Sequence, residues 1–508
     1  MKNKIVISLC LWLSCHSIYA QQPPNIIVFI VDDMGWQDTA VPFWNRTTNW
    51  NNRYHTPAME RLAKEGMKFT NAYAAPVCTP SRVSLLTGMN AAHHRVTNWT
   101  LRKNQSVDEA DSLLQSPDWN VNGLSPIPNI EHTVYATPLP QLLQQQGYYT
   151  IHCGKAHFGA METPGADPLN LGFVKNIAGH AAGGLGSYLG EKNYGNQKGM
   201  HSLPWGVPGL EAYHGSDVFL TEALTREALR ALDSPVQQKQ PFFLYMAHYA
   251  VHIPYAADKR FMNRYIKMGL PPKEAEYAAL VEGMDNSLAD LLHYLDEKGI
   301  SNNTVIFFVS DNGGFTLQPR AGEPFTQNKP LRSGKGSVYE GGIRVPMLVK
   351  YPGITKPGSV CNQPVLIEDF FSTLLAIAGI EHPNMVQSTD GKSFLSLLYN
   401  PQKTLDANRK LIWHFPNKWI PDNTAPGINY HSAMREGKWK LVYNIRSGEH
   451  ELYDIDSDIE ELHNVAKKYP AITQRLSREI SEQLRKWNAD MPIVKASGKR
   501  AMMADGKE

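Results

Sequence analysis

Two pairs of oxygen-bearing side chains stand directly after short apolar runs of this sequence. Asp32 and Asp33 follow NIIVFIV, and Asp311 and Asn312 follow NTVIFFVS. Neighbouring side chains on a strand point to opposite faces, so each pair can share one ion only where the strand ends and the chain turns. One such pair more often caps a helix or opens a turn, but two pairs after matching runs favour a metal site. Four oxygen donors without cysteine or histidine favour a hard cation, Ca²⁺ or Mg²⁺, over zinc.

Basic side chains follow two further runs of the same kind. Lys155 and His157 follow YYTIHCG, and His248 and His252 follow PFFLYMA. Such groups bind anions or transfer protons when they face a site. Taken singly, each is more often solvated or bonded to the backbone, so its role depends on whether it lies near the carboxylates.

Cys78 is a lone cysteine at the start of an expected helix. Thr79 fits the N-cap, Pro80 fits the first turn and Gly88 follows the apolar stretch. Backbone N–H groups and the helix dipole favour an anion beside such an N-terminus. The thiol therefore stands where an anionic substrate can bind, although the adjacent sequence offers it neither a base nor a partner.

These side chains need a fold that brings several strand ends together. Continuous apolar runs of this length are typical of strands covered on both faces, as in a parallel sheet with helices outside. The spacers TPAMERLAKEG and TPLPQLLQQQG each carry a threonine, a proline in the first turn and a closing glycine, which predicts helices. Ligands of open α/β sheets lie beyond the carboxyl ends of the strands, so we expect the four polar clusters to meet in one cleft.

The first residues have the features of a cleavable secretory signal. In residues 1–20, Lys2 and Lys4 precede the apolar run 5–13. We therefore expect an exported protein, in the bacterial periplasm or outside the cell, with lipidation of Cys15 as the less favoured alternative. No later run reaches the roughly 20 apolar residues of a membrane helix. Removing the two lysines from 50 basic residues leaves 48 against 48 acidic ones, which gives no indication of a nucleic-acid partner.

The remaining chain divides into two units and a tail. We expect an α/β domain over residues 21–405 and a smaller α+β subdomain over residues 406–492, where GKWKLVYN and HELYDI predict antiparallel strands. In that subdomain PAITQRLSREISEQLRKWNAD predicts an amphipathic closing helix. Residues 493–508 are polar, and we expect a flexible tail. Pairing of Cys153 with Cys361 stays open, although the apolar setting of Cys153 favours a buried thiol.

Residues 78–82, CTPSR, resemble the Cys-x-Pro-x-Arg signature of type I sulfatases, in which a maturation enzyme oxidises the cysteine to formylglycine. Further segments resemble that family in the same order, namely VDDMGW, GKAHFG, VHIP, SDNGG and SGKGSVYEGGIRVP. AMREGKWKLVYN and HELYDIDSDIEELHNVA resemble its C-terminal domain, so the likeness runs from about residue 25 to about residue 465. It implies the alkaline-phosphatase-like α/β fold, a mainly parallel sheet flanked by helices.

The resemblance implies hydrolysis of a sulfate ester by hydrated formylglycine at position 78, with one Ca²⁺ ion. One hydroxyl of the hydrate attacks sulfur, and His252 protonates the leaving oxygen beside Lys335. His157 takes a proton from the second hydroxyl to release sulfate, and the other basic residues offset negative charge. The implied catalytic residues are Cys78, Arg82, Lys155, His157, His252 and Lys335, and the implied metal ligands are Asp32, Asp33, Asp311, Asn312 and the modified Cys78.

Irregular loops are expected to select the substrate. Their Gly, Trp, Tyr, His and Arg content suits a sugar, because aromatic rings stack on sugar faces, although each aromatic can equally serve packing. TNWTLRKN and YHGSDVFLTEALT also resemble exported bacterial carbohydrate sulfatases, including some that act on sulfated galactose or N-acetylgalactosamine. The candidate substrate-binding residues are Trp99, Arg102, His180, His214, His248 and Arg320.

Two other functions stay open at this point. The alkaline-phosphatase-like fold includes phosphodiester and phosphonate monoester hydrolases, but Asn312 and the intact run from Cys78 favour sulfate. A noncatalytic protein that binds sulfated glycans would be expected to lack some of the implied catalytic residues, and all six are present. The sequence carries no indication of the oligomeric state.

Overall fold

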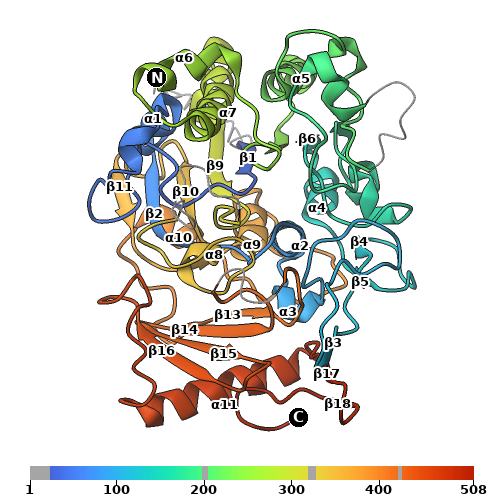
Figure 1. Cartoon of the computed structure of the whole chain (residues 1–508). Coiled ribbons are helices and arrows are strands. Elements are labelled where there is room, and N and C mark those ends of the chain that lie inside the picture. Colours follow the sequence, from blue (N-terminus) through green and yellow to red (C-terminus); the bar gives the residue numbers. More distant parts are fainter. Residues whose placement is uncertain (1–22, 197–203, 318–327, 422–425) are drawn as a thin grey trace, which may run out of the picture.

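The computed structural model describes residues 23–196, 204–317, 328–421 and 426–508. The expected leader with Cys15, and also Arg320, lie outside the described residues. Helices cover a central sheet, and a smaller sheet with one long helix lies at the C-terminal end of the chain, at the bottom of Figure 1. Within the described residues, no helix is both long enough and apolar enough to cross a membrane.

A nine-stranded sheet forms the centre of the described chain, in the order β11-β2-β10-β9-β1-β8-β6-β7 with β12 beside β2. The four runs expected as strands are neighbours and run parallel, namely β9 (Thr304–Ser310), β1 (Asn25–Val31), β8 (Phe242–Ala247) and β6 (Tyr149–Gly154). Their carboxyl ends therefore lie at one edge. Because β10 is antiparallel to both β9 and β2, the sheet is mixed. Its other strands are β2 (Met67–Tyr73), β7 (Lys175–Ile177), β10 (Arg344–Lys350), β11 (Ser359–Cys361) and β12 (Val365–Leu366).

Strand β1 is buried on both faces, which explains its unbroken apolar run. Ile27 and Phe29 belong to the core beneath one helical layer, whereas Ile26 and Val28 belong to the core beneath the other. The first layer contains α1 (Pro57–Glu65), α5 (Leu220–Gln237), α6 (Lys259–Lys267) and α7 (Pro272–Glu297). The second contains α2 (Cys78–Thr87), α4 (Leu139–Gln145), α9 (Asp369–Ile377) and α10 (Leu395–Tyr399). Shorter elements are α3 (Ala91–His94), α8 (Glu340–Ile343), β4 (Gly123–Ser125) and β5 (Thr133–Tyr135).

The C-terminal part forms a four-stranded antiparallel sheet in the order β13-β14-β15-β16. Helix α11 (Pro470–Lys486) packs on one side of it, through Leu476 and Ile480. The other side shares a core with the main domain, in which Trp413 lies with Tyr73. The strands are β13 (Lys410–Phe415), β14 (His431–Glu436), β15 (Trp439–Asn444) and β16 (His450–Asp454).

Residues 493–508 pack on this subdomain, which corrects the expectation of a flexible tail. Strand β17 (Ile493–Val494) pairs with β3 (Leu114–Gln115) of the main domain and with β18 (Lys499–Arg500). Met503 is buried in the core beneath α11, and the Asp505 carboxylate accepts a hydrogen bond from Arg485 (2.7 Å). A few apolar side chains within a polar segment are enough to hold it.

A buried charge network joins the two units. Lys440 of β15 donates to Glu340 of α8 (2.9 Å) and lies 2.8 Å from Glu461, with all three side chains fully buried. Burial opposes ionisation of Glu340, but the charge of Lys440 holds its pKa down to about 2. Burial raises the pKa of Glu461 to about 7 against the same lysine. Lys440 therefore balances two carboxylates that would otherwise repel each other.

We expect Lys440→Met to destabilise the protein by about 3–5 kcal/mol, because it leaves buried carboxylates without their cation. Urea denaturation followed by tryptophan fluorescence measures the change. Lys438→Met is the matched control, since its partner Asp454 and the lysine are both partly solvated, and it should cost less than about 1 kcal/mol. Equal losses in the two variants would contradict the role given to Lys440.

Candidate active site

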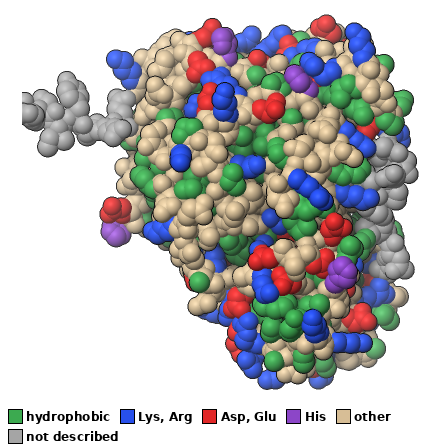
Figure 2. Space-filling model, turned by 90° about the vertical axis from the view of Figure 1, so that its left-hand side faces the viewer, with side chains coloured by type: hydrophobic (Ala, Val, Ile, Leu, Met, Phe, Trp, Pro, Cys, Tyr) green, Lys and Arg blue, Asp and Glu red, His purple; other side chains and the backbone are tan. Residues whose placement is uncertain are grey.

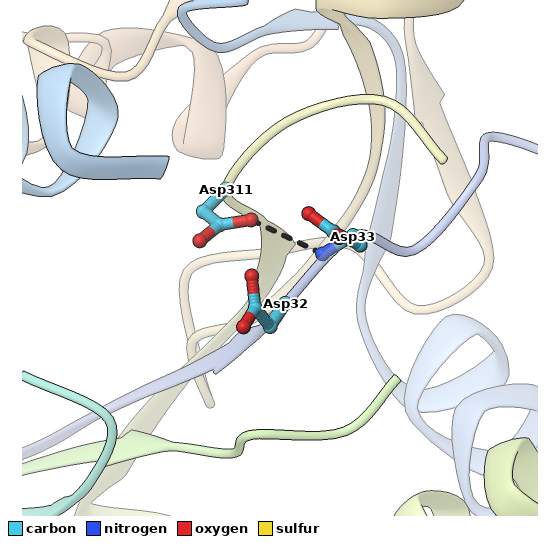
Figure 3. Close-up of side chains that lie close together, drawn as sticks. All are labelled: Asp32, Asp33 and Asp311. Carbon is cyan, nitrogen blue, oxygen red and sulfur yellow. Dashed lines mark hydrogen bonds between the residues drawn. The ribbon is translucent and has the colours of Figure 1, made fainter. Parts of the chain in front are cut away.

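Three carboxylates converge where β1 and β9 end. These strands are paired in parallel up to Val31 and Ser310, so the residues that follow them are neighbours. Asp33 has a φ of 59°, in the left-handed region, which marks the turn predicted at this point. Figure 3 shows the carboxylates of Asp32, Asp33 and Asp311 around one point, and one oxygen of each lies within 4.8 Å of the others. The Asp33 N–H donates to Asp311 Oδ1 (3.2 Å).

Three cationic side chains balance these carboxylates in the interior. Lys155 bonds Asp32 (2.6 Å), Lys335 bonds Asp33 (2.7 Å) and the Arg82 Nε donates to Asp311 (2.9 Å). Burial raises the pKa of Asp32, and the other carboxylates add to this effect. Burial also opposes ionisation of Asp33, but the Lys335 charge holds its pKa below the usual range. All six side chains are at most 4% exposed, so each needs its partner.

The acidic cluster fits a hard cation. Asp32 Oδ1 and Asn312 Oδ1 are buried, and within the described residues neither accepts a hydrogen bond. The Asn312 amide nitrogen donates to Asp33 Oδ1 (2.8 Å), which fixes the amide with its oxygen available. Carboxylate and amide oxygens are the donors that Ca²⁺ takes in proteins. The three carboxylates and Asn312 would hold such an ion and relieve their mutual repulsion.

Cys78 begins α2 and faces His157. Its Sγ lies 3.3 Å from His157 Nδ1, and burial raises the pKa of the thiol. The expected N-cap is wrong, because Val77 precedes the helix and Thr79 lies within it. The Thr79 hydroxyl instead lies 3.0 Å from His157 Nε2 and accepts from the Thr100 N–H (3.2 Å). The imidazole that the adjacent sequence does not provide therefore comes from the end of β6.

The backbone fixes the tautomer of His157. Its Nε2 lies 2.8 Å from the carbonyl oxygen of Thr100, and a carbonyl only accepts, so Nε2 carries the proton. Nδ1 then faces Cys78 as an unprotonated acceptor. Burial lowers the pKa of His157, and the Lys155 charge lowers it further, which keeps the ring neutral. Gly183 covers the ring closely, because a Cβ there would lie 2.0 Å from Cε1. His157 is thus held as a base toward position 78.

His252 borders both the charged centre and a cavity. Its Nε2 lies 3.8 Å from Asp33, and its Nδ1 lies 2.6 Å from the Ile253 carbonyl oxygen. Burial lowers its pKa to about 3, and Lys335 contributes to the shift. The cavity has a volume of about 500 Å³ and is lined by Gly184, Leu185, Gly186, Trp205, His252, Ile253, Pro254, Tyr255, Lys273 and Glu276.

His248 does not face the cavity, which corrects its assignment to the substrate. Its imidazole is fully buried, with Nε2 2.8 Å from the Ser287 hydroxyl of α7 and the ring against Phe29. Burial lowers its pKa to about 3. His248 and His252 follow the same strand, but only the second lies beyond its end.

The other candidate substrate residues do not line this cavity. His180 bonds through its carbonyl to the His157 N–H (3.3 Å), and its ring lies 3.4 Å from the Pro204 oxygen. His214 packs edge-on to Tyr194 at 6.0 Å. Trp99 is half-buried and Arg102 is exposed, on either side of the Thr100 carbonyl that holds His157.

The sequence analysis missed four contributors to the site. Thr100 and Gly183 position His157, while Trp205 and Lys273 line the cavity. Trp205 stands in a loop expected to reach the cleft, but the residues of that loop gave no reason to choose it. Cys153 and Cys361 are both free and buried, which answers the open question of their pairing.

The fold and the buried charge cluster define a hydrolase of the alkaline-phosphatase-like class. Residues 24–380 match the family model described as Sulfatase. Residues 334–489 match the model described as N-sulphoglucosamine sulphohydrolase, C-terminal. The chain therefore belongs to the sulfatase family.

Similar proteins extend along most of the chain. A sulfatase of Formosa agariphila is 30% identical over 513 residues, covering 92% of this chain and 89% of that protein. The N-acetylgalactosamine-6-sulfatase of Mus musculus is 28% identical, covering 91% and 87%. The crystal structure of Ps i-CgsB in complex with k-i-k-neocarrahexaose is 28% identical with a TM-score of 0.68, covering 91% and 93%. The enzyme is a sulfatase.

We expect Gly183→Ala to lower kcat/KM by about 100-fold, because the added methyl group must displace the His157 ring by an ångström or more. Release of 4-nitrocatechol from its sulfate ester measures the rate. Thermal unfolding of the same sample separates misplacement of the base from loss of fold. A fully active variant with an unchanged melting temperature would argue against the position given to His157.

We expect Ca²⁺ to raise the melting temperature of chelator-treated protein by several degrees, since an ion at 100 times its Kd stabilises the folded state by about 2.7 kcal/mol. Asn312→Ala should weaken this response at least tenfold in Ca²⁺ concentration, because it removes one oxygen donor. Asn303→Ala, exposed before the other end of β9, is the control. The site would be refuted by a wild-type melting curve that Ca²⁺ does not move.

Proposed function

We propose that this enzyme removes sulfate from a sulfated saccharide, using formylglycine formed from Cys78 by a maturation enzyme and one Ca²⁺ ion. The single observation that carries the proposal is the contact of Cys78 Sγ with His157 Nδ1 beside the buried charge cluster. The hydrated aldehyde would supply the nucleophilic hydroxyl, and the ion would offset negative charge around it. Both are implied by the sulfatase family, and the acidic cluster supports the ion.

The roles of the surrounding residues follow from their contacts. His157 accepts a proton at position 78 through Nδ1, because Nε2 is committed to Thr100. Arg82 donates to the Lys155 carbonyl (2.8 Å), so these two cations are held together at the base of the site. Both lower the cost of bringing an anionic ester into the interior.

His252 and Lys335 stand on the side where the alcohol leaves. Cleavage of the sulfur–oxygen bond leaves a negative oxygen that must gain a proton. In the free protein burial and Lys335 disfavour the charged imidazole. A bound sulfate group offsets the Lys335 charge and favours protonation of His252, which then donates to the leaving oxygen. This arrangement couples proton transfer to substrate binding.

The cavity beside His252 supports a sugar as the leaving group. Trp205 is 38% exposed at its edge and offers a surface on which a sugar ring can stack, while the exposed Lys273 can bond an anionic substituent. The relatives named above include an N-acetylgalactosamine-6-sulfatase and a protein crystallised with a neocarrahexaose. We therefore propose a sulfated galactose or N-acetylgalactosamine residue as the substrate.

The working compartment follows from the leader expected at residues 1–20. We propose export to the periplasm or the medium, with lipidation of Cys15 as the lesser alternative. Sulfated polysaccharides are large and highly charged, so an enzyme that acts on them benefits from standing outside the cytoplasm. The free thiols Cys153 and Cys361 are compatible with export because both are buried.

We expect peptide mass spectrometry of protein from its own host to find formylglycine at position 78, and the mature enzyme to release sulfate from galactose 6-sulfate or N-acetylgalactosamine 6-sulfate. Cys78→Ala should lower the rate by at least 1000-fold, because the nucleophile is absent. Matched phosphate esters serve as the comparison, and faster phosphate than sulfate release would favour the phosphohydrolase alternative. Binding of sulfated sugars without turnover by fully converted protein would favour the noncatalytic one.

A further inference from the structure

A second cavity, larger than the one beside His252, lies outside the catalytic centre. It has a volume of about 690 Å³ and shares no residue with the charge cluster or with the 500 Å³ cavity. Its walls come from the loop between β1 and α1, the segment before Lys335 and the C-terminal subdomain. They are Trp44, Arg46, Thr47, Thr48, Asn49, Trp50, Lys329, Pro330, Leu331, Arg332, Ser333, Pro426, Glu460 and Leu462.

The loop between β1 and α1 forms the outer wall of this cavity. It is the deep blue loop that reaches the left-hand side of Figure 1. Figure 2 turns that side to the viewer, where basic and acidic side chains are interspersed with hydrophobic ones over a hollowed surface. Such a mixed surface suits a ligand with both apolar faces and charges rather than a purely apolar partner.

Two indole rings in the wall are held before any ligand arrives. The Arg46 guanidinium lies 4.2 Å from the Trp44 ring centroid, and the Arg53 guanidinium lies 4.2 Å from that of Trp50. Arg53 is itself held by Glu274 (2.9 Å). Both rings are half-buried. A ring fixed in this way loses little conformational entropy when a sugar stacks on it.

Two cations of the wall have charge available for a ligand. Arg46 and Lys329 are exposed, and neither makes an ion pair within the described residues. Arg332 is committed elsewhere, because its Nη1 donates to the Tyr453 hydroxyl and to the Glu461 carbonyl (both 2.9 Å). Glu460 is the one acidic residue of the wall, so an anion is favoured near Arg46 and Lys329.

The cavity is connected to the catalytic centre by a short piece of chain. Ser333 lines it, and Lys335 lies two residues further along, so their Cα atoms are at most about 7 Å apart. A saccharide of several residues can therefore span from the centre into this cavity, whereas a monosaccharide cannot fill both.

From these observations we propose that the 690 Å³ cavity is a second saccharide subsite, which binds a sulfated residue of the same chain that is being desulfated. Trp44 and Trp50 provide stacking surfaces, and Arg46 and Lys329 bind a sulfate group. The inference rests on the proposed function, because the ligand is taken to be a sulfated saccharide. It adds that the enzyme selects oligosaccharides over single sugars.

Calorimetric titration of full-length Cys78→Ala protein tests the subsite without turnover. The probes are a chondroitin 6-sulfate hexasaccharide, a carrageenan hexasaccharide, their desulfated forms and N-acetylgalactosamine 6-sulfate. Lys329→Ala should weaken binding of at least one sulfated hexasaccharide about tenfold and leave its desulfated form unchanged. Trp50→Ala should weaken both forms. Lys356→Ala, an exposed lysine outside the cavity, is the charge-matched control and should have no effect.

Unchanged hexasaccharide affinity in Lys329→Ala, or no binding of either hexasaccharide by the Cys78→Ala parent, would overturn the subsite. Lys329 is exposed, so this variant keeps the test valid even when Trp50→Ala fails to fold. Sulfate release by the mature wild-type enzyme reports separately on the proposed function. A working sulfatase with equal affinities in both variants would remove the subsite alone, and absence of sulfate release would remove the proposed function.

Discussion

Six ionisable side chains meet in the interior at the carboxyl end of the sheet, and the rest of the active site depends on their balance. A carboxylate buried without a partner costs several kcal/mol, so Asp32, Asp33 and Asp311 can stand together only beside Lys155, Lys335 and Arg82. Parallel strands make this possible, because adjacent strands end at the same edge and deliver their polar residues to one point. The same cations that permit the acidic cluster also make the site attractive to an anionic ester. Structural necessity and substrate affinity thus come from one set of groups.

The elements that carry this cluster were predictable from the sequence because their signals are local. An unbroken apolar run before Asp32, or before Asp311, reports burial on both faces of a strand, and the polar residue after it reports the end of that strand. The family signature from Cys78 to Arg82 adds roles that no periodicity contains. The contact of Cys78 with His157 depends on where β6 lies in the sheet, and the resemblance implied it before the structure placed it.

The remaining features depend on packing between distant segments, which leaves no local pattern. His248 and His252 look alike in sequence, and Ser287, 39 residues beyond His248, decides that the first belongs to the core. Gly183 matters because it touches a ring 26 positions earlier, and glycine-rich loops give no indication of which glycine does so. The last 16 residues read as polar, yet a few apolar side chains such as Met503 anchor them. The two cavities are likewise assembled from segments far apart in the chain.

The buried link from Glu340 through Lys440 to Glu461 also bears on how the chain is made. Glu340 leaves the ribosome 100 residues before its partner Lys440, which at 5–20 residues per second is roughly 5–20 seconds. During that interval every residue of the charge cluster has been synthesised, but the α8 carboxylate still lacks the cation that permits its burial. A chain that stopped before Lys440 would carry all the chemical groups of the active site and yet could not close its core. The C-terminal subdomain therefore acts as a completeness check, in which only a fully synthesised chain reaches the native state.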